Sequence, residues 1–283
     1  MSRCNAPIPK NDYEEPQCLL INEVDHIPEN IRPIPQQRVI AKMDDYMSRR
    51  DYDGAERHLL YWLGEAKAGQ DLRGELLVRN ELVGHYRKVS NREAAFQSAE
   101  EALRLVKTLD YDGSISSGTT YTNVATMYNA FGENEKALHY FEKAKAVYEA
   151  SPATGAELLG GLYNNMALVN VALKRYQTAR TLYEQALDAM GKAPYGELDQ
   201  AITYLNMANA LEDELGPEEA EGKIFDLLDQ ALALLDTEGI PHGGYYAFVC
   251  EKCYPTFAYY GYFSDAERLK QLSETIYKQR NEE

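Results

Sequence analysis

The feature of this sequence that most restricts its fold is a segment that recurs with a nearly constant period. Asn123 and Asn165 occupy equivalent places 42 residues apart, and Asn206 follows 41 residues later. Around each asparagine, an apolar stretch with helical spacing leads into a second stretch of the same kind. A period of this size is typical of arrays in which each helical hairpin buries its apolar face against its neighbours. The sequence therefore predicts an all-α chain built from stacked hairpins.

The same register can be followed in both directions, and it predicts six hairpins. Ala55 and Ala95 extend it toward the N-terminus, and Ala266 extends it toward the C-terminus. Glycine, proline and short polar clusters separate the helical stretches and mark the turns. We expect one repeat domain over residues 36–283, with hairpins at about 36–68, 71–109, 114–150, 155–191, 196–237 and 242–280.

Two hairpins depart from the regular pattern. In the fifth, the apolar register places the second half four residues later than in the fourth, which predicts a lengthened turn. Gly216 and Pro217 are expected to start the second helix there, or a short helix ahead of it. In the sixth, Pro255 lacks a backbone donor and is expected to interrupt or kink the first helix.

The third and fourth hairpins resemble the tetratricopeptide repeat. Residues 124–128 (VATMY) and 137–141 (ALHYF) follow the family pattern L-G-x-x-Y…A-x-x-x-F, and residues 179–183 (ARTLY) repeat its second half. The period exceeds the usual length of about 34 residues by roughly two helical turns. Such long repeats resemble those of kinesin light chains and of bacterial peptide-sensing regulators. The resemblance covers about residues 38–280 and implies a right-handed α-solenoid superhelix.

The resemblance also implies a binding role for the recurring asparagines. In tetratricopeptide arrays the first helices line the concave surface, where asparagines at this place hold the backbone of an extended peptide. A carboxamide offers both a donor and an acceptor, so it can pair with a peptide unit of any sequence. The predicted function is a non-catalytic scaffold that binds an extended segment of another protein. The candidate peptide-binding residues are Arg79, Asn80, Tyr86, Asn123, Asn129, Asn165, Asn206, Asn209 and Lys252.

Other interpretations stand beside this one. The asparagines can instead tie one helix to the next inside each hairpin. The aromatic first half of the sixth hairpin can be a cap on the array or a surface for a homodimer. A sensor or adaptor subunit that regulates a separate effector is a further alternative. A clamp for a terminal carboxylate is not favoured, because the available cations, Arg79, Arg87 and Lys252, are scattered.

Composition argues against several classes of function. With 283 residues and a net charge of −16, the chain would be repelled by phosphate backbones and anionic lipids, so neither nucleic acid nor a membrane is an expected partner. Cys250 and Cys253 form one C-x-x-C, whereas a structural zinc site needs four ligands, so packing cysteines are favoured and no cofactor is expected. No motif of a nucleophile elbow, phosphate loop or metalloprotease helix is present.

The first 35 residues read as a proline-rich leader, because prolines this dense prevent a long helix. An apolar patch at residues 18–21, followed by Ile-Pro pairs at 27–28 and 34–35, suggests an extended segment that occupies the groove of its own or a neighbouring molecule. A disordered tail is the alternative. The N-terminus has no apolar signal-peptide core, and no apolar run approaches the length of a membrane span, so a cytoplasmic protein is expected.

Overall fold

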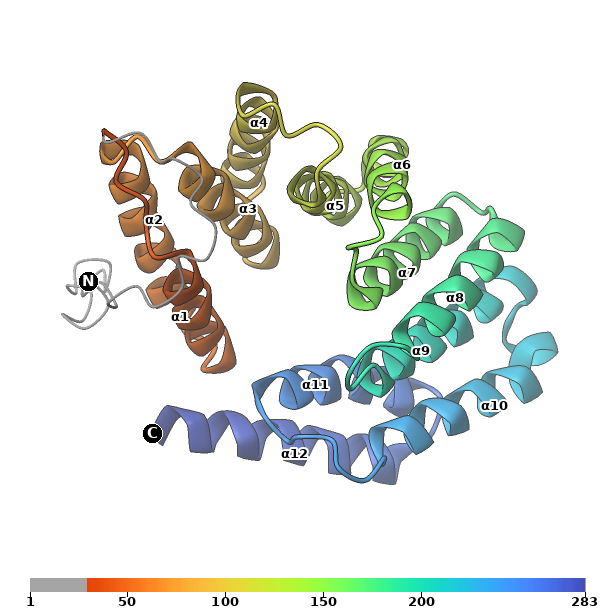
Figure 1. Ribbon diagram of the computed structural model, residues 1–283. Coiled ribbons are helices and arrows are strands. Elements are labelled where there is room, and N and C mark those ends of the chain that lie inside the picture. Colours follow the sequence, from red (N-terminus) through yellow and green to blue (C-terminus); the bar gives the residue numbers. More distant parts are fainter. Residues whose placement is uncertain (1–29, 283) are drawn as a thin grey trace. The chain divides into compact units, whose positions relative to one another are not determined.

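The computed structural model describes residues 30–282, and every regular element among them is a helix (Figure 1). This confirms the all-α solenoid class. The leader segments at residues 18–21 and 27–28 lie outside the described residues. The chain divides into two compact units, residues 1–112 and 113–283, which we describe one at a time. None of the described helices is long and apolar enough to cross a membrane.

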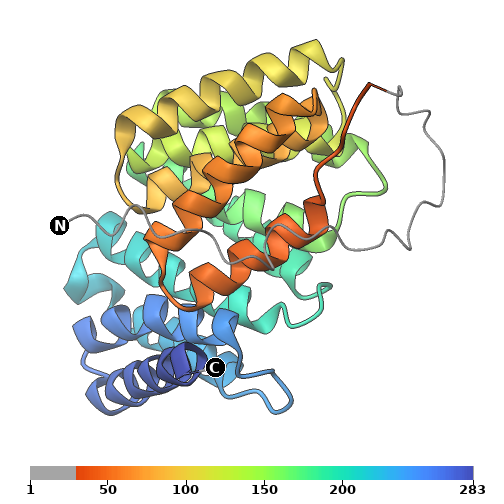
Figure 2. The ribbon, with the colours of Figure 1, turned by 90° about the vertical axis from the view of Figure 1, so that its left-hand side faces the viewer.

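Unit 1 contains two antiparallel hairpins whose helix ends recur every 20 residues. A residue in the left-handed region precedes each new start, with φ of 53–58° at Arg50, Gln70, Ser90 and Asp110. The next residue is then an N-cap whose side chain accepts a backbone hydrogen bond, as asparagine and aspartate do well. The helices are α1 (Gln36–Ser48), α2 (Tyr52–Ala68), α3 (Leu72–Lys88) and α4 (Arg92–Thr108), and Figure 2 shows them from the side.

The last residues of the leader pack against the turn between α2 and α3. The amide of Arg32 donates to the carbonyl of Gly69 at 2.9 Å, and the amide of Ile34 donates to the Asp71 carboxylate at 2.9 Å. Ile34 is buried, with 6% of its side chain exposed. Asp71 therefore has two roles, since the same carboxylate also caps α3 through the amide of Gly74. The described end of the leader is thus part of the core of unit 1.

Glu81 on α3 supplies a pH-dependent element in unit 1. Burial and the nearby Asp44 carboxylate raise the pKa of Glu81 from 4.5 to about 7. The folded state therefore holds more protons than the unfolded chain between those pH values, and stability falls as pH rises from 4.5 through 7. We expect Glu81→Gln to raise the free energy of unfolding by about 2 kcal/mol at pH 8 and to leave it unchanged at pH 4.

Urea denaturation at the two pH values measures this effect. The exposed Glu100→Gln on α4 is the matched control and should change nothing at either pH. An equal gain at both pH values would contradict the titration and point to a packing effect instead.

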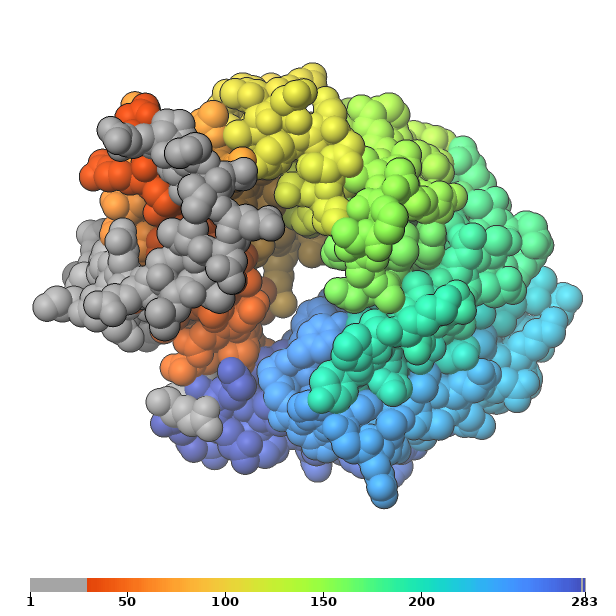
Figure 3. Space-filling model, viewed as in Figure 1, coloured from red at the N-terminus to blue at the C-terminus, as the bar shows by residue number. Residues whose placement is uncertain are grey.

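Unit 2 contains the remaining four hairpins, each of which packs on the next. Within a hairpin the two helices make the most extensive contacts, and the second helix of one hairpin touches the first helix of the following one. In the space-filling view these hairpins form a continuous body from α5 to α12 (Figure 3). The helices are α5 (Ile115–Ala130), α6 (Asn134–Ala150), α7 (Ala156–Ala172), α8 (Tyr176–Met190), α9 (Glu197–Leu215), α10 (Pro217–Leu235), α11 (Gly244–Tyr259) and α12 (Phe263–Glu282).

The positions that defined the repeat in the sequence form the core of unit 2. Ala137 and Ala179 are small enough to let the two helices of a hairpin approach each other, and both are buried. One turn further along, Phe141 and Tyr183 fill the space between successive hairpins with 0% and 1% exposure. Each hairpin therefore contributes one large ring to its interface with the next hairpin.

Two local predictions for unit 2 were wrong. The fifth hairpin has no lengthened turn, because Gly216 alone joins α9 to α10 and the additional residues extend the helices, which have 19 residues each. Gly216 allows this direct join with a φ of 81°, and Pro217 fits the first helical position, where no amide donor is needed. Pro255 lies inside α11 without interrupting it.

Candidate peptide-binding face

The first helices of unit 2 form its inner layer. α5 contacts α7, α7 contacts α9, and α9 contacts α11, whereas the second helices of neighbouring hairpins have scarcely any contact with one another. Helices that lie closer together on one side of a stack make that side the concave one. The candidate site on residues 113–282 is therefore the surface of α5, α7, α9 and α11 that faces away from the second helices.

Tyrosines two residues before the asparagines fix the direction in which the asparagines point. Tyr121 on α5 contacts the Tyr140 ring on α6 with centroids 6.3 Å apart, and Tyr163 on α7 donates a hydrogen bond to Glu149 at the end of α6. Residues two apart on a helix are separated by about 200° around its axis. Asn123 and Asn165 therefore face away from α6, toward the inner layer.

The carboxamides of Asn123 and Asn165 are available for an outside partner. Both side chains are half-buried, and neither has a hydrogen-bond partner among the described residues. Asn129, two turns further along α5, is in the same condition. A half-buried amide without a partner favours a ligand that can pair with it.

Asn206 instead contributes a contact between hairpins. Its amide donates to the Oδ1 of Asn164 at 3.1 Å, and the hydroxyl of Thr203 donates to the same oxygen at 3.2 Å. Asn164 is buried, with 9% exposed, and it was not singled out in the sequence. The only signal for it was the tandem pair Asn164-Asn165. The bond joins α9 to α7, whereas a tie inside one hairpin was the alternative expected from the sequence.

The two remaining candidates of unit 2 lie at its C-terminal end and are exposed. Asn209 on α9 accepts a hydrogen bond from the hydroxyl of Tyr260 at 3.2 Å. Lys252 on α11 lies over the ring of Phe248, with its ammonium 5.7 Å from the centroid. Both are therefore held by aromatic residues of the sixth hairpin, and their role in peptide binding stays a prediction.

The candidates of unit 1 are buried on α3. Arg79 and Asn80 are each 9% exposed and Tyr86 is 7% exposed. The guanidinium of Arg79 lies 3.7 Å from the carboxylate of Glu75, one turn before it on the same helix. Their assignment to a binding face also stays a prediction, and the argument below rests on unit 2 alone.

The tyrosines of the sixth hairpin attach it to the fifth. Tyr259 and Tyr260 both donate to the carboxylate of Glu212 on α9, at 2.8 and 2.7 Å. Tyr262 donates to Asp229 on α10 at 2.7 Å, and this contact together with burial raises the pKa of Tyr262 to about 12. Tyr245 makes a further bond to Asp199 of α9. This pattern favours the cap interpretation of the aromatic cluster.

The two cysteines of the C-x-x-C pack in the same hairpin. Cys250 and Cys253 are free thiols with 0% and 1% exposure. Burial raises the pKa of Cys250 to about 11, so the thiol stays protonated at neutral pH. Within residues 30–282, no three histidine, cysteine or carboxylate side chains are grouped as metal ligands would be.

Comparison with known families agrees with this geometry. The tetratricopeptide repeat family model matches residues 118–151 and 160–192, which are the third and fourth hairpins. Two hairpins of this chain match tetratricopeptide repeats. The family resemblance inferred from the sequence is thereby confirmed. No curated protein matches the chain.

Solved structures of tetratricopeptide proteins are similar to the chain at low identity. A Rap protein complexed with Competence and Sporulation Factor is 15% identical with a TM-score of 0.55, over 87% of this chain and 65% of that one. BtubC (BKLC) from P. vanneervenii is 18% identical with a TM-score of 0.46, over 88% and 93%. A putative kinesin light chain from Podosopora anserina is 16% identical with a TM-score of 0.47, over 70% and 92%.

Proposed function

We propose that this protein is a non-catalytic scaffold that binds an extended segment of another protein along the first helices of unit 2. The observation that carries the proposal is the pair of unpaired carboxamides of Asn123 and Asn165. They occupy the same place on neighbouring first helices and point away from the second helices. The cytoplasmic location and the exclusion of nucleic-acid and membrane partners stay predictions from the sequence.

The spacing of the hairpins suits an extended chain. Packed helices lie about 10 Å apart, and an extended peptide advances about 3.3 Å per residue, so one asparagine would meet about every third peptide unit. Two hydrogen-bonded carboxamides contribute about 2 kcal/mol net. Micromolar affinity requires about 8 kcal/mol, so apolar and aromatic side chains of the same face must contribute most of the affinity. The half-buried Leu168 on α7 is one candidate.

The related fold is compatible with a binding role. The Rap protein to which the chain is similar was crystallised with Competence and Sporulation Factor. That likeness concerns the fold, and the partner of the present chain is proposed here only by its chemistry, an extended polypeptide.

A random-peptide display screen on the wild type and on Asn123→Ala/Asn165→Ala tests the proposal. Asn206 is left intact, because its loss would also disturb the bond to Asn164. The wild type should enrich a peptide consensus, and calorimetry with one enriched peptide should give about thirtyfold weaker binding to the double variant. Circular dichroism must confirm that both proteins are folded.

Gln185→Ala/Gln230→Ala is the matched control, since it removes two exposed carboxamides from the second helices α8 and α10. Its affinity should equal that of the wild type. No enrichment on the wild type, or equal affinity of the asparagine variant, would refute the binding face. Light scattering of the same samples addresses the second candidate, a homodimer through the exposed rings of Tyr259 and Phe263.

A further inference from the structure

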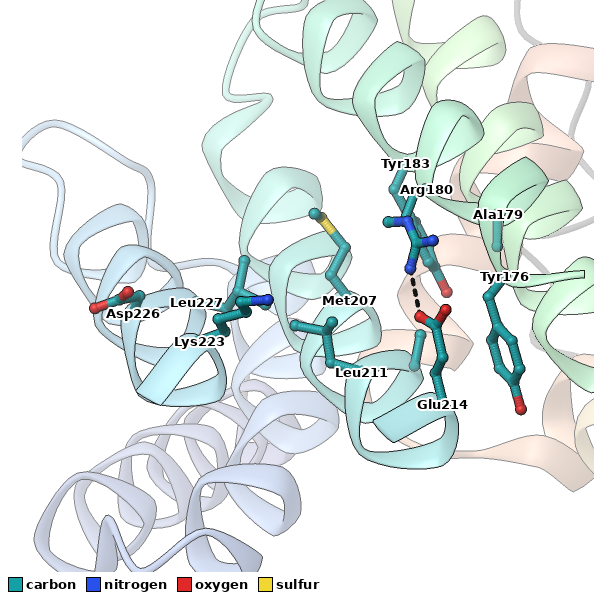
Figure 4. A pocket seen from close by; sticks show the side chains of 11 residues that line it. Tyr176, Ala179, Arg180, Tyr183, Met207, Leu211, Glu214, Lys223, Asp226 and Leu227 are labelled. Carbon is teal, nitrogen blue, oxygen red and sulfur yellow. Dashed lines mark hydrogen bonds and ion pairs between the residues drawn. The ribbon is translucent and has the colours of Figure 1, made fainter. Parts of the chain in front are cut away.

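A cavity of about 290 Å³ lies between α8, α9 and α10, apart from the proposed peptide-binding face. In Figure 4, Met207 and Leu211 of α9 lie in the middle, with Tyr183 of α8 on one side and Leu227 of α10 on the other. These residues belong to the side of α9 that faces the second helices. The cavity is therefore independent of the asparagines on the inner layer.

One small residue explains why the cavity is present in the fifth hairpin. Ala210 on α9 occupies the repeat position of Val169 on α7 and Met127 on α5. Val169 and Met127 both have 0% exposure and fill their positions completely. With only a methyl group at Ala210, the corresponding space between the hairpins stays open, and Ala210 lines it.

A polar atom is buried in the wall of this otherwise apolar cavity. The hydroxyl of Tyr183 is inaccessible to solvent and has no hydrogen-bond partner among the described residues. The equivalent residue of the third hairpin is Phe141, which has no hydroxyl and is equally buried. A buried hydroxyl without a partner is unfavourable, so it indicates a group that pairs with it in a bound state.

Water does not suit this place well. A buried water molecule needs two to four polar partners, whereas Met207, Leu211, Leu227 and Ala179 surround the phenol with apolar atoms. A ring-containing molecule would gain from the apolar walls and from contact with the thioether of Met207.

Charges at the edge of the cavity are balanced. Arg180 of α8 forms an ion pair with Glu214 of α9, drawn as a dashed line in Figure 4. Lys223 and Asp226 of α10 add one charge of each sign. The edge therefore has no net charge with which to attract an ion, and an uncharged ligand fits it better.

From this combination we propose that the cavity between α8, α9 and α10 binds a small uncharged ring-containing molecule whose single polar group pairs with the Tyr183 hydroxyl. A volume of this size is at the lower end for ligand sites and suits one or two rings. Indole is a suitable probe, because its N–H can donate to the phenol oxygen. Indene has the same shape and no N–H.

Binding of both probes to the full chain can be followed by ligand-observed NMR and calorimetry. The wild type should bind indole at millimolar concentration or below and indene more weakly. Tyr183→Phe should weaken indole binding about fivefold and leave indene binding unchanged, because only the hydrogen bond is lost. Ala210→Leu should abolish binding of both probes by filling the space.

Tyr183→Phe is expected to fold, since phenylalanine occupies the equivalent place in the third hairpin, and Tyr195→Phe at an exposed site is the matched control. Absence of indole binding to the wild type, or binding that neither substitution changes, would overturn the proposal. Tighter binding of N-acetyl-tryptophan amide than of indole would assign the cavity to a partner's side chain and likewise overturn it.

Discussion

Replacing Phe141 with alanine should lower the free energy of unfolding by about 4 kcal/mol. The ring has 0% exposure and packs between the third and fourth hairpins among Leu162 and Met166 of α7. Its removal loses the transfer free energy of the ring and leaves a cavity that two rigid helices cannot close. Because a repeat array can unfold in parts, urea denaturation should be followed by circular dichroism together with hydrogen exchange of α6 and α7.

Phe263→Ala is the matched control for this experiment. It removes the same ring from the start of α12, where 72% of the side chain is exposed. We expect a change within about 0.5 kcal/mol. Equal losses for the two variants would show that burial of Phe141 is not what holds the third and fourth hairpins together.

The second large effect is expected at Asp71. Its carboxylate accepts the amides of Gly74 and Ile34, and only 5% of the residue is exposed. Asp71→Ala should therefore lower the free energy of unfolding by about 3 kcal/mol, because it removes a helix cap and leaves the buried Ile34 amide unpaired. Urea denaturation gives the loss, and faster hydrogen exchange at Ile34 identifies the place where the structure opens.

Asp51 provides an unusually close control for Asp71. It caps α2 through the amide of Gly54 at 2.8 Å, in the same Asp-x-x-Gly sequence, but accepts no second amide. Asp51→Ala should lower stability by about 1 kcal/mol, as loss of a cap alone does. The same loss at both positions would mean that residues 30–34 contribute nothing through Asp71.

Local chemistry explains why much of the fold was predictable. Helix starts at Tyr52, Leu72 and Arg92 follow capping side chains that the sequence displays directly. The alternation of Ala137 and Phe141 reports which face of a helix is buried. These signals depend on neighbouring residues within one or two turns, so they can be read without knowledge of the tertiary structure.

The errors and omissions concern information that is not local. The register of the fifth hairpin gave the number of additional residues but not whether they were loop or helix, and they are helical in α9 and α10. The bond from Asn206 to Asn164 depends on which faces of two helices meet across 42 residues. The cavity at Ala210 is created by missing atoms, and a missing side chain leaves no pattern in the sequence.

The regular spacing of the left-handed residues in unit 1 has a consequence for how such a chain can change in length. Arg50 and Ser90 each stand at the same point of a hairpin, 40 residues apart. Removing or duplicating the segment between them would join the same kind of ending to the same kind of cap. Whole hairpins are therefore exchangeable modules in this unit, and an insertion or deletion of 40 residues leaves every downstream turn in phase, whereas one of any other length has to be absorbed in a loop.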